Sequence, residues 1–245
     1  MKLGPEEFDI ECTTVWSFPR RGKWATHKST WRGNWSPEVV RNIMLRYSNE
    51  GDTLLVPMIG GGTTAIEAKI LNRNLICSDI NQVAIDRTKE SLLFDVENES
   101  WQKVVHRDAR DQSEIKDESV DLVLTHPPYA NIIKYSNGEI NEDLSNIHDI
   151  DEFISEMDVV AKEMFRVLKP GKYCAILMGD TRRKKMYQPM AYMVMQKFLN
   201  AGFLLKEDII KKQHNCKATG FWVNKSKDYN FLLIMHEHLF IFLKP

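Results

Sequence analysis

The sequence predicts an α/β protein built on a doubly wound, mostly parallel β-sheet. Short apolar runs alternate along the chain with segments of helical periodicity, which is the pattern of strands joined by helices. Loops rich in glycine, aspartate and proline follow the apolar runs. The last two runs have no clear helical period between them, so we expect an antiparallel strand at the C-terminal edge of the sheet.

The predicted strands and helices alternate from residue 53 to the end of the chain. Strands are expected at residues 53–58, 74–78, 104–105, 120–124, 172–178, 203–210 and 239–242. Helices are expected at residues 65–71, 83–93, 151–168 and 188–200. In an open sheet of this kind, ligands bind outside the carboxyl ends of the strands. The loops at those ends are therefore where a functional site is expected.

Length and composition favour one domain over residues 1–245, with the basic and aromatic segment 1–36 packed on it and no separate large recognition domain. No apolar run is long enough to cross a bilayer, and the N-terminus lacks the pattern of a signal peptide. The four cysteines are scattered without a CxxC pair. We therefore expect no metal or disulfide framework, no membrane contact and a cytoplasmic location.

Basic residues gather in clusters although the formal net charge is only -1. In the N-terminal segment they are interleaved with tryptophans, a combination that suits phosphate neutralisation and base stacking. A solvated surface above a few core tryptophans is the alternative interpretation. The residues expected to contact nucleic acid are Arg20, Arg21, Lys23, Arg182, Arg183 and Lys184.

Three strand ends describe a pocket for a nucleoside. Gly60 and Gly62 allow close approach of a ligand to the backbone at a helix N-terminus, and with Ala65 they fit a relaxed dinucleotide-binding spacing. Asp79 stands where a carboxylate accepts hydrogen bonds from a ribose, and Asp108 stands where an adenine edge would lie. These loops alone leave open whether the nucleoside carries a pyrophosphate.

The loop after the fourth strand reads His126-Pro127-Pro128-Tyr129. Consecutive prolines fix the backbone and present rigid carbonyl groups, which are good acceptors for an amino N–H. Tyr129 offers a flat face to a base, and a neutral His126 ring can accept a second hydrogen bond. The loop is therefore a cradle for a planar amine beside a nucleoside cofactor, for which a hydride-transfer enzyme has no use.

In these motifs the chain resembles the S-adenosylmethionine-dependent DNA amino methyltransferases that modify cytosine N4 or adenine N6. In that family the loop after the fourth strand reads Asp/Asn/Ser-Pro-Pro-aromatic, and a cofactor loop of the form Asp-Pro-Phe/Met-x-Gly-x-Gly-Thr-Thr appears here as residues 56–64. The segment Gly33-Asn34-Trp35-Ser36-Pro37 is similar to the one that closes over the methionine end of the cofactor, and residues 237–244 resemble the last strand. The resemblance covers nearly the whole chain.

The resemblance implies a Rossmann-like methyltransferase fold, S-adenosylmethionine as the cofactor, and double-stranded DNA with one base flipped out as the partner. It implies catalytic roles for His126, Pro127, Pro128 and Tyr129. The implied cofactor-binding residues are Trp35, Ser36, Pro57, Gly60, Gly62, Thr63, Thr64, Asp79, Asn81, Asp108 and Ala109. No metal is implied, and we interpret His236-Glu237-His238 as structural because alternation along a strand sends histidine and glutamate to opposite faces.

Two positions depart from the family pattern: His126 replaces Asp, Asn or Ser, and Val56 replaces Asp. Cytosine N4, which is slightly favoured, and adenine N6 therefore both stay open as the target. An RNA base amino methyltransferase and a catalytically silent DNA-binding subunit are the alternative functions. Sequence recognition is expected either from the short stretches 130–150 and 211–230 or from a homodimer or a partner subunit. A mobile loop is expected beside the pocket at residues 131–144.

Overall fold

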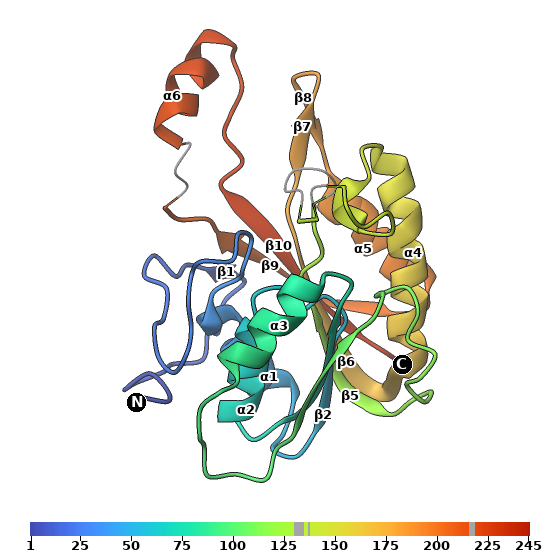
Figure 1. Cartoon of the computed structure of the whole chain (residues 1–245). Coiled ribbons are helices and arrows are strands. Elements are labelled where there is room, and N and C mark those ends of the chain that lie inside the picture. Colours follow the sequence, from blue (N-terminus) through green and yellow to red (C-terminus); the bar gives the residue numbers. More distant parts are fainter. Residues whose placement is uncertain (130–134, 137, 216–218) are drawn as a thin grey trace.

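Helices cover both faces of a central eight-stranded sheet in the computed structural model, which describes residues 1–129, 135–136, 138–215 and 219–245 (Figure 1). The order of the strands is β1-β9-β10-β6-β5-β2-β3-β4. Their bounds are β1 Val15–Trp16, β2 Thr53–Val56, β3 Asn74–Asp79, β4 Gln102–His106, β5 Val120–Thr125, β6 Leu168–Met178, β9 Leu204–Lys212 and β10 His236–Leu243. The predicted α/β class and the mostly parallel sheet are confirmed.

Five helices form the two layers outside the sheet. They are α1 Pro37–Tyr47, α2 Thr63–Ile70 and α3 Gln82–Ser91 on one face, and α4 Ile150–Val167 and α5 Met190–Asn200 on the other. The sheet residues alternate between the two cores, since Leu239 and Ile241 of β10 pack with α1–α3 while Phe240 and Phe242 pack with α4 and α5. None of the described helices has the length and hydropathy needed to cross a membrane.

The C-terminal strand β10 is antiparallel, as predicted, but its expected place at the edge of the sheet is wrong. It lies between β6 and β9 and pairs with both in the antiparallel sense. Residues 237–242 are all buried, so both faces of the strand are covered as in the centre of a sheet. The edge beyond β9 is formed by β1, which pairs parallel to it.

The predicted elements begin at residue 53, so they lack β1 and α1, and two projections were absent from them as well. The helix α6 (Thr219–Asp228) lies between β9 and β10, where no helix was expected, and none of its residues is buried. A helix that packs on nothing carries no apolar stripe, so its sequence lacks the helical period. The second projection is a hairpin of β7 (Thr181–Arg183) and β8 (Met186–Gln188), whose turn places Lys184 and Lys185 at φ 49° and 68°.

The carboxyl ends of β2, β3, β4 and β5 meet at one edge of the sheet because these four strands are mutually parallel. The β10 strand runs the other way, so its first residues, His236 and Glu237, lie at this same edge beside the ends of β6 and β9. Both projections stand above this edge (Figure 1). Residues 131–134 and 137 of the loop expected at 131–144 lie outside the described residues, as do residues 216–218 of the stretch 211–230.

Candidate active site

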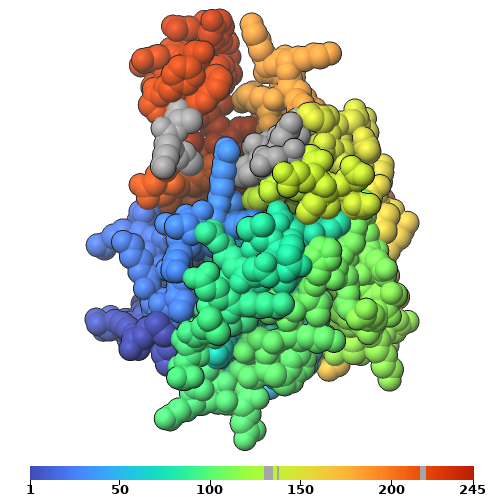
Figure 2. Space-filling view, in the orientation of Figure 1, coloured from blue at the N-terminus to red at the C-terminus, as the bar shows by residue number. Residues whose placement is uncertain are grey.

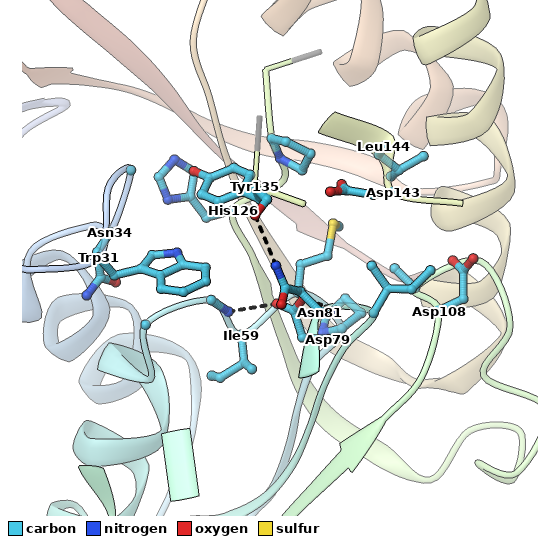
Figure 3. Close-up of a pocket in the computed structure, with 18 of the residues that line it drawn as sticks. Trp31, Asn34, Ile59, Asp79, Asn81, Asp108, His126, Tyr135, Asp143 and Leu144 are labelled. Atoms are coloured by element: carbon cyan, nitrogen blue, oxygen red, sulfur yellow. Dashed lines mark hydrogen bonds between the residues drawn. The ribbon is translucent and has the colours of Figure 1, made fainter. Parts of the chain in front are cut away.

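A cavity with about 740 Å³ of empty space, part of it open to solvent, lies at this edge (Figure 3). The predicted residues that line it are Trp35, Pro57, Gly60, Asp79, Asn81, Asp108, Ala109, His126 and Pro128. Six others do not line it but lie next to its lining residues or to one another in the sequence, namely Ser36, Gly62, Thr63, Thr64, Pro127 and Tyr129. The cavity therefore joins the strand ends that the sequence singled out.

Asp79 links the glycine loop to helix α3 at the floor of the cavity. Its Oδ2 accepts the backbone N–H of Gly60 at 2.9 Å, and its Oδ1 accepts that of Asn81 at 2.9 Å (Figure 3). Burial raises the pKa of Asp79 to about 6, and the two backbone hydrogen bonds oppose that rise. Asn81 caps α3 by accepting the N–H of Val83, and its amide donates to the Tyr135 carbonyl.

Trp31 and Tyr135 form a stacked pair across the mouth of the cavity. Their ring centroids lie 5.7 Å apart at an interplanar angle of 9° (Figure 3). Trp31 also lies so close to the glycine loop that a Cβ on Gly61 would be 2.6 Å from the Trp31 Cβ. Gly61 is therefore needed for the approach of this indole.

The two threonines after the glycine loop hold the N-terminal segment. Thr64 Oγ1 accepts the indole N–H of Trp35 at 3.1 Å, and Thr63 Oγ1 accepts a guanidinium N–H of Arg21 at 3.1 Å. Arg21 also donates to the carbonyls of Asn34 and Trp35 at 3.1 and 2.6 Å. Arg21 thus points into the protein, whereas the sequence placed it among the DNA contacts.

The environment of Ser36 shows whether a cofactor with a carboxylate fits the part of the cavity beside Trp35 and the N-terminus of α1. Ser36 is the N-cap of α1, yet it makes no capping hydrogen bond, and its buried Oγ has no partner among the described residues. Its neighbour Trp35 lines the cavity. A helix N-terminus with a spare hydroxyl suits a carboxylate, so the residues present fit the methionine end of S-adenosylmethionine.

Two strand ends show how the side chains at the cavity are constrained. Asp108 lies in the wall but pairs with Arg110, whose Nε is 3.0 Å from Oδ1, so its carboxylate is partly committed. Val56, which replaces the family's aspartate, is 1% exposed and packs in the core of the α1–α3 face. A polar contact from position 56 to a cofactor is therefore lost.

His126 and Tyr129 are joined by a hydrogen bond beside the diproline turn. His126 Nε2 lies 2.7 Å from the Tyr129 hydroxyl, which donates to Glu237 Oε1 at 2.8 Å. The Tyr129 ring packs against Gly179, where a Cβ would lie 2.5 Å from the ring. His126 also tilts against Trp35, with the ring centroids 5.5 Å apart.

Sequence reasoning missed several groups at this site. Trp31 and Tyr135 carry no motif, and the loop length alone did not reveal that they meet. Glu237 was assigned with its histidine neighbours to a structural role. The sequence did contain a signal for Glu237: it lies between two histidines in a strand, so its carboxylate is expected on the opposite face from them.

The two histidines of this motif face a separate cluster. His236, His238 and Asp180 bring ligand atoms within 4.8 Å of one another, a grouping that could hold a metal ion. His238 Nδ1 is 3.0 Å from Asp208 Oδ1, and its Nε2 is 3.7 Å from Asp180 Oδ2. The structural role that the sequence gave these histidines stays a prediction.

The basic residues of the hairpin meet the arm formed by residues 219–235, which comprises α6 and the stretch returning to β10. Arg182 donates to the Leu232 carbonyl at 2.9 Å, and its guanidinium lies 5.6 Å from the Phe231 ring centroid. Lys185 lies 5.4 Å from the centroid of Tyr229. A notch separates the arm from the hairpin above the body of the molecule (Figure 2).

The arm exposes large apolar side chains together with lysines. Phe221 is 61% exposed, Trp222 43% and Leu232 83%. Lys225 lies over both α6 aromatics, 4.4 Å from the Phe221 centroid and 5.4 Å from that of Trp222. The arm is thus an aromatic and basic surface near the cavity.

Comparison with known proteins identifies a family and several relatives of this chain. A family model described as DNA methylase, of the N6 and N4 type, matches residues 2–90 and 120–245. The chain is 31% identical over 144 residues to the Type II methyltransferase M.MjaI of Methanocaldococcus jannaschii, covering 49% of this chain and 47% of that protein. It is 28% identical over 157 residues to the Type II methyltransferase M.MthZI of Methanothermobacter thermautotrophicus, covering 58% and 44%. The chain spans about half the length of these curated relatives.

Solved structures share the fold at low sequence identity. TrmN from Thermus thermophilus superposes with a TM-score of 0.60 at 18% identity, covering 87% of this chain and 50% of that one. A SAM-dependent methyltransferase from Methanosarcina mazei gives 0.57 at 16% identity, covering 82% and 96%. These likenesses confirm the predicted Rossmann-like methyltransferase fold.

Proposed function

Because the chain belongs to the DNA methylase family, we propose that it transfers a methyl group from S-adenosylmethionine to an exocyclic amine of a base in DNA. One observation carries the proposal. His126 and Pro128, from the cradle for a planar amine, line the same cavity as Asp79 and Asp108, from the nucleoside pocket. The cavity therefore suits an amine and a nucleoside cofactor held side by side.

S-adenosylmethionine is the cofactor of the chain, as the motifs indicated. When bound, it supplies a methyl group on a positively charged sulfur, an excellent leaving group. Asp79 would accept hydrogen bonds from the ribose hydroxyls, and Asp108 with Ala109 would border the adenine. Ser36 and the N-terminus of α1 would hold the carboxylate, with Trp35 covering that end.

The residues of the cradle align and polarise the amine. The Pro127 carbonyl and the His126 ring accept its two N–H groups, which favours a tetrahedral nitrogen with an available lone pair. The bound cofactor would supply the methyl group to this nitrogen and keep the electron pair of the C–S bond on its sulfur, while the proton released by the amine would pass to solvent water. Tyr129, which is held by Gly179 and Glu237, offers the exposed part of its ring to the base.

The amine of a paired base cannot reach this cavity, so the base must leave the duplex, at a cost of a few kcal/mol. Phosphate contacts offset that cost. We assign these contacts to Arg20 and Lys23 in the N-terminal segment and to Arg182, Arg183 and Lys184 in the hairpin. Arg21 supports the segment from inside, since its guanidinium is committed to two carbonyls and Thr63.

The target base and the means of recognition complete the proposal. We favour cytosine N4 over adenine N6, and we assign sequence recognition to the arm at 219–235, alone or together with a second copy or a partner subunit. The basic and aromatic surface of the arm supports this role, because its lysines suit phosphates and its aromatics suit bases.

Radiolabelled methyl transfer tests the proposal directly. Wild-type protein should label DNA and not RNA, whereas Pro127→Ala combined with Tyr129→Ala should abolish labelling. Trp101→Ala, an exposed tryptophan at the end of the sheet far from the cavity, should keep full activity. Full activity in the double variant would overturn the site assignment, and cofactor binding without any transfer would indicate a silent subunit.

The modified base is identified on DNA from an expressing host. Sequencing that reports N4-methylcytosine and N6-methyladenine separately should show N4-methylcytosine within one recurrent sequence. N6-methyladenine in its place would correct the base while keeping the reaction.

A further inference from the structure

A chain of four polar side chains runs from the cavity wall into the protein. His126 Nε2 is 2.7 Å from the Tyr129 hydroxyl, the hydroxyl donates to Glu237 Oε1 at 2.8 Å, and Lys211 Nζ donates to Glu237 Oε2 at 2.7 Å. Glu237 is only 6% exposed, so each of its oxygens is satisfied by protein. The inward position of β10 creates the chain, because it places Glu237 beside the end of β6 and next to Lys211 of β9.

The charge of Glu237 fixes the direction of these hydrogen bonds. Glu237 forms a largely buried ion pair with Lys211, whose Nζ lies 2.7 Å from Oε2, and this partner keeps the carboxylate ionised. The pKa of Glu237 is lowered accordingly, although burial alone would raise it. Burial together with Glu237 raises the pKa of Tyr129 well above its usual value. Tyr129 is therefore a protonated donor facing an ionised carboxylate, and a carboxylate can only accept.

The direction at Tyr129 determines the proton at His126. The Tyr129 hydroxyl donates its one hydrogen to Glu237. Its oxygen therefore accepts a hydrogen bond from His126, so His126 Nε2 must carry a hydrogen. Burial lowers the pKa of His126 to about 4, so the ring is neutral at pH 7 and has only one N–H. The Nδ1 atom then carries a lone pair, and no group among the described residues hydrogen-bonds to it.

We propose that Glu237 and Lys211 are positioning residues that act through Tyr129 to hold His126 in the Nε2–H form, so that Nδ1 accepts an N–H of the target amine. The assignment rests on the proposed methyl transfer. It explains how His126 can accept a hydrogen bond at the position where the resemblance predicts an oxygen of Asp, Asn or Ser. An imidazole has one donor and one acceptor, so without a fixed tautomer it would turn an N–H toward the amine in part of the molecules.

Nitrogen NMR of the free protein tests the tautomer without any reaction. With ¹⁵N-labelled histidine, the His126 signals are identified by their loss in His126→Asn. At pH 7.5 the wild type should show a protonated Nε2 and an unprotonated Nδ1. A protonated Nδ1, or a doubly protonated ring, would overturn the proposal.

Two variants break the chain while keeping its shape. Glu237→Gln should convert the His126 signals to a mixture of tautomers, because an amide can donate to Tyr129 as well as accept from it. Tyr129→Phe keeps the packing on Gly179 and should have the same effect, which covers the case that Glu237→Gln does not fold. Asp208→Asn is the matched control, since Asp208 pairs with His238 on the other face of β10 and should leave His126 unchanged. The Nε2–H form persisting in both chain variants would refute the role of Glu237.

Kinetics separate this role from a purely structural one. Glu237→Gln should lower kcat about tenfold or more while the affinity for S-adenosylmethionine stays within about twofold. In a Tyr129→Phe background the same change should cost less than about twofold, because the two residues act in series. Unchanged kcat with mixed tautomers would overturn the catalytic part. No labelling of DNA by the wild type, with the tautomer as expected, would defeat the methyl-transfer function and leave the tautomer assignment standing.

Discussion

At the scale of single residues, Asp79 and His126 lie in one cavity wall with opposite protonation behaviour. Burial dominates both shifts, but it raises the pKa of the carboxyl to about 6 and lowers that of the imidazole to about 4. At neutral pH Asp79 is therefore charged and His126 neutral. Each can then accept hydrogen bonds, and the proposed function gives Asp79 a ribose and His126 an amine as the donor.

The affinity for S-adenosylmethionine should fall as the pH drops below about 6. Protonation of Asp79 removes an acceptor for the ribose, so the dissociation constant should rise by up to about tenfold per pH unit between pH 6 and pH 5. Calorimetric titration from pH 8 to pH 5 measures this dependence. Asp79→Asn should bind more weakly at pH 8 and show no such dependence.

Protonation of Asp79 does not destabilise the folded protein, so acid unfolding caused by this group cannot explain the loss of cofactor affinity. Its folded-state pKa lies above its unfolded value near 3.8, so its contribution to stability is full below pH 3.8 and is lost as the pH rises through about 6. As the pH falls from 8 to 5, the protonation of Asp79 makes the free protein more stable, whereas the cofactor binds less well. An affinity that stays constant over this range would refute the ribose contact.

At the scale of elements, helix α2 anchors the N-terminal segment through one buried carboxylate. Glu67 is 0% exposed, and it accepts from Trp24 Nε1 at 2.6 Å and Arg41 at 2.9 Å. His27 Nε2 lies 2.7 Å from the same carboxylate. The segment carrying Trp31 and Trp35 is therefore tied to helix α2 through Trp24 and His27.

Glu67→Ala should lower the free energy of unfolding by about 3–5 kcal/mol, because it leaves several buried donors without an acceptor. Urea unfolding measures the loss, and limited proteolysis within residues 1–36 should become faster. Glu90→Ala is the control: it removes an exposed carboxylate 3.6 Å from Lys28 and should change stability by less than about 1 kcal/mol. Equal effects of the two changes would show that the anchor is unimportant.

From residue 53 to α5 the order of the main strands and helices was predictable, because each of them has a buried face that gives its sequence a period of strand or helix. The strand-end residues Asp79, Asp108 and His126 followed from that order, since parallel strands bring their carboxyl ends together. The arm was not predictable, because α6 buries nothing and so has no period. The inward place of β10 depends on pairing between distant residues, which local patterns do not record. For the same reason the contact of Glu237 with Tyr129 was missed.

Removing charge from the hairpin should weaken DNA binding and leave cofactor binding intact. Arg182→Ala, Arg183→Ala and Lys184→Ala combined should reduce the slope of log affinity against log salt by about 2–3, since each phosphate contact contributes roughly 0.9. Fluorescence anisotropy with duplex DNA at several salt concentrations measures the slope. Replacing the exposed Lys89, Lys103 and Lys116 by alanine removes the same charge elsewhere and should leave the slope unchanged. A slope insensitive to the hairpin variant would remove the hairpin from the interface.

At the scale of the whole molecule, the cavity lies at the edge of the sheet above which the hairpin and the arm project (Figure 1). A duplex lying against the two projections would face the cavity mouth, where Trp31 and Tyr135 stack. The proposed function requires the base to leave its pair to reach His126, so the energy of that extraction would be part of the affinity for DNA.

A duplex whose target base is mismatched should consequently bind more tightly than the fully paired duplex. Extraction costs a few kcal/mol for a paired base and less for a mismatched one, so a saving of about 1.4 kcal/mol would raise affinity about tenfold. Competition binding between the two duplexes measures the ratio, once the methylated sequence is known from host DNA. A mismatch placed one helical turn away is the control, because it softens the duplex without freeing the target. Equal affinity for all three duplexes would mean that the base stays stacked on binding, and the cavity would then have to act on DNA that is already single-stranded.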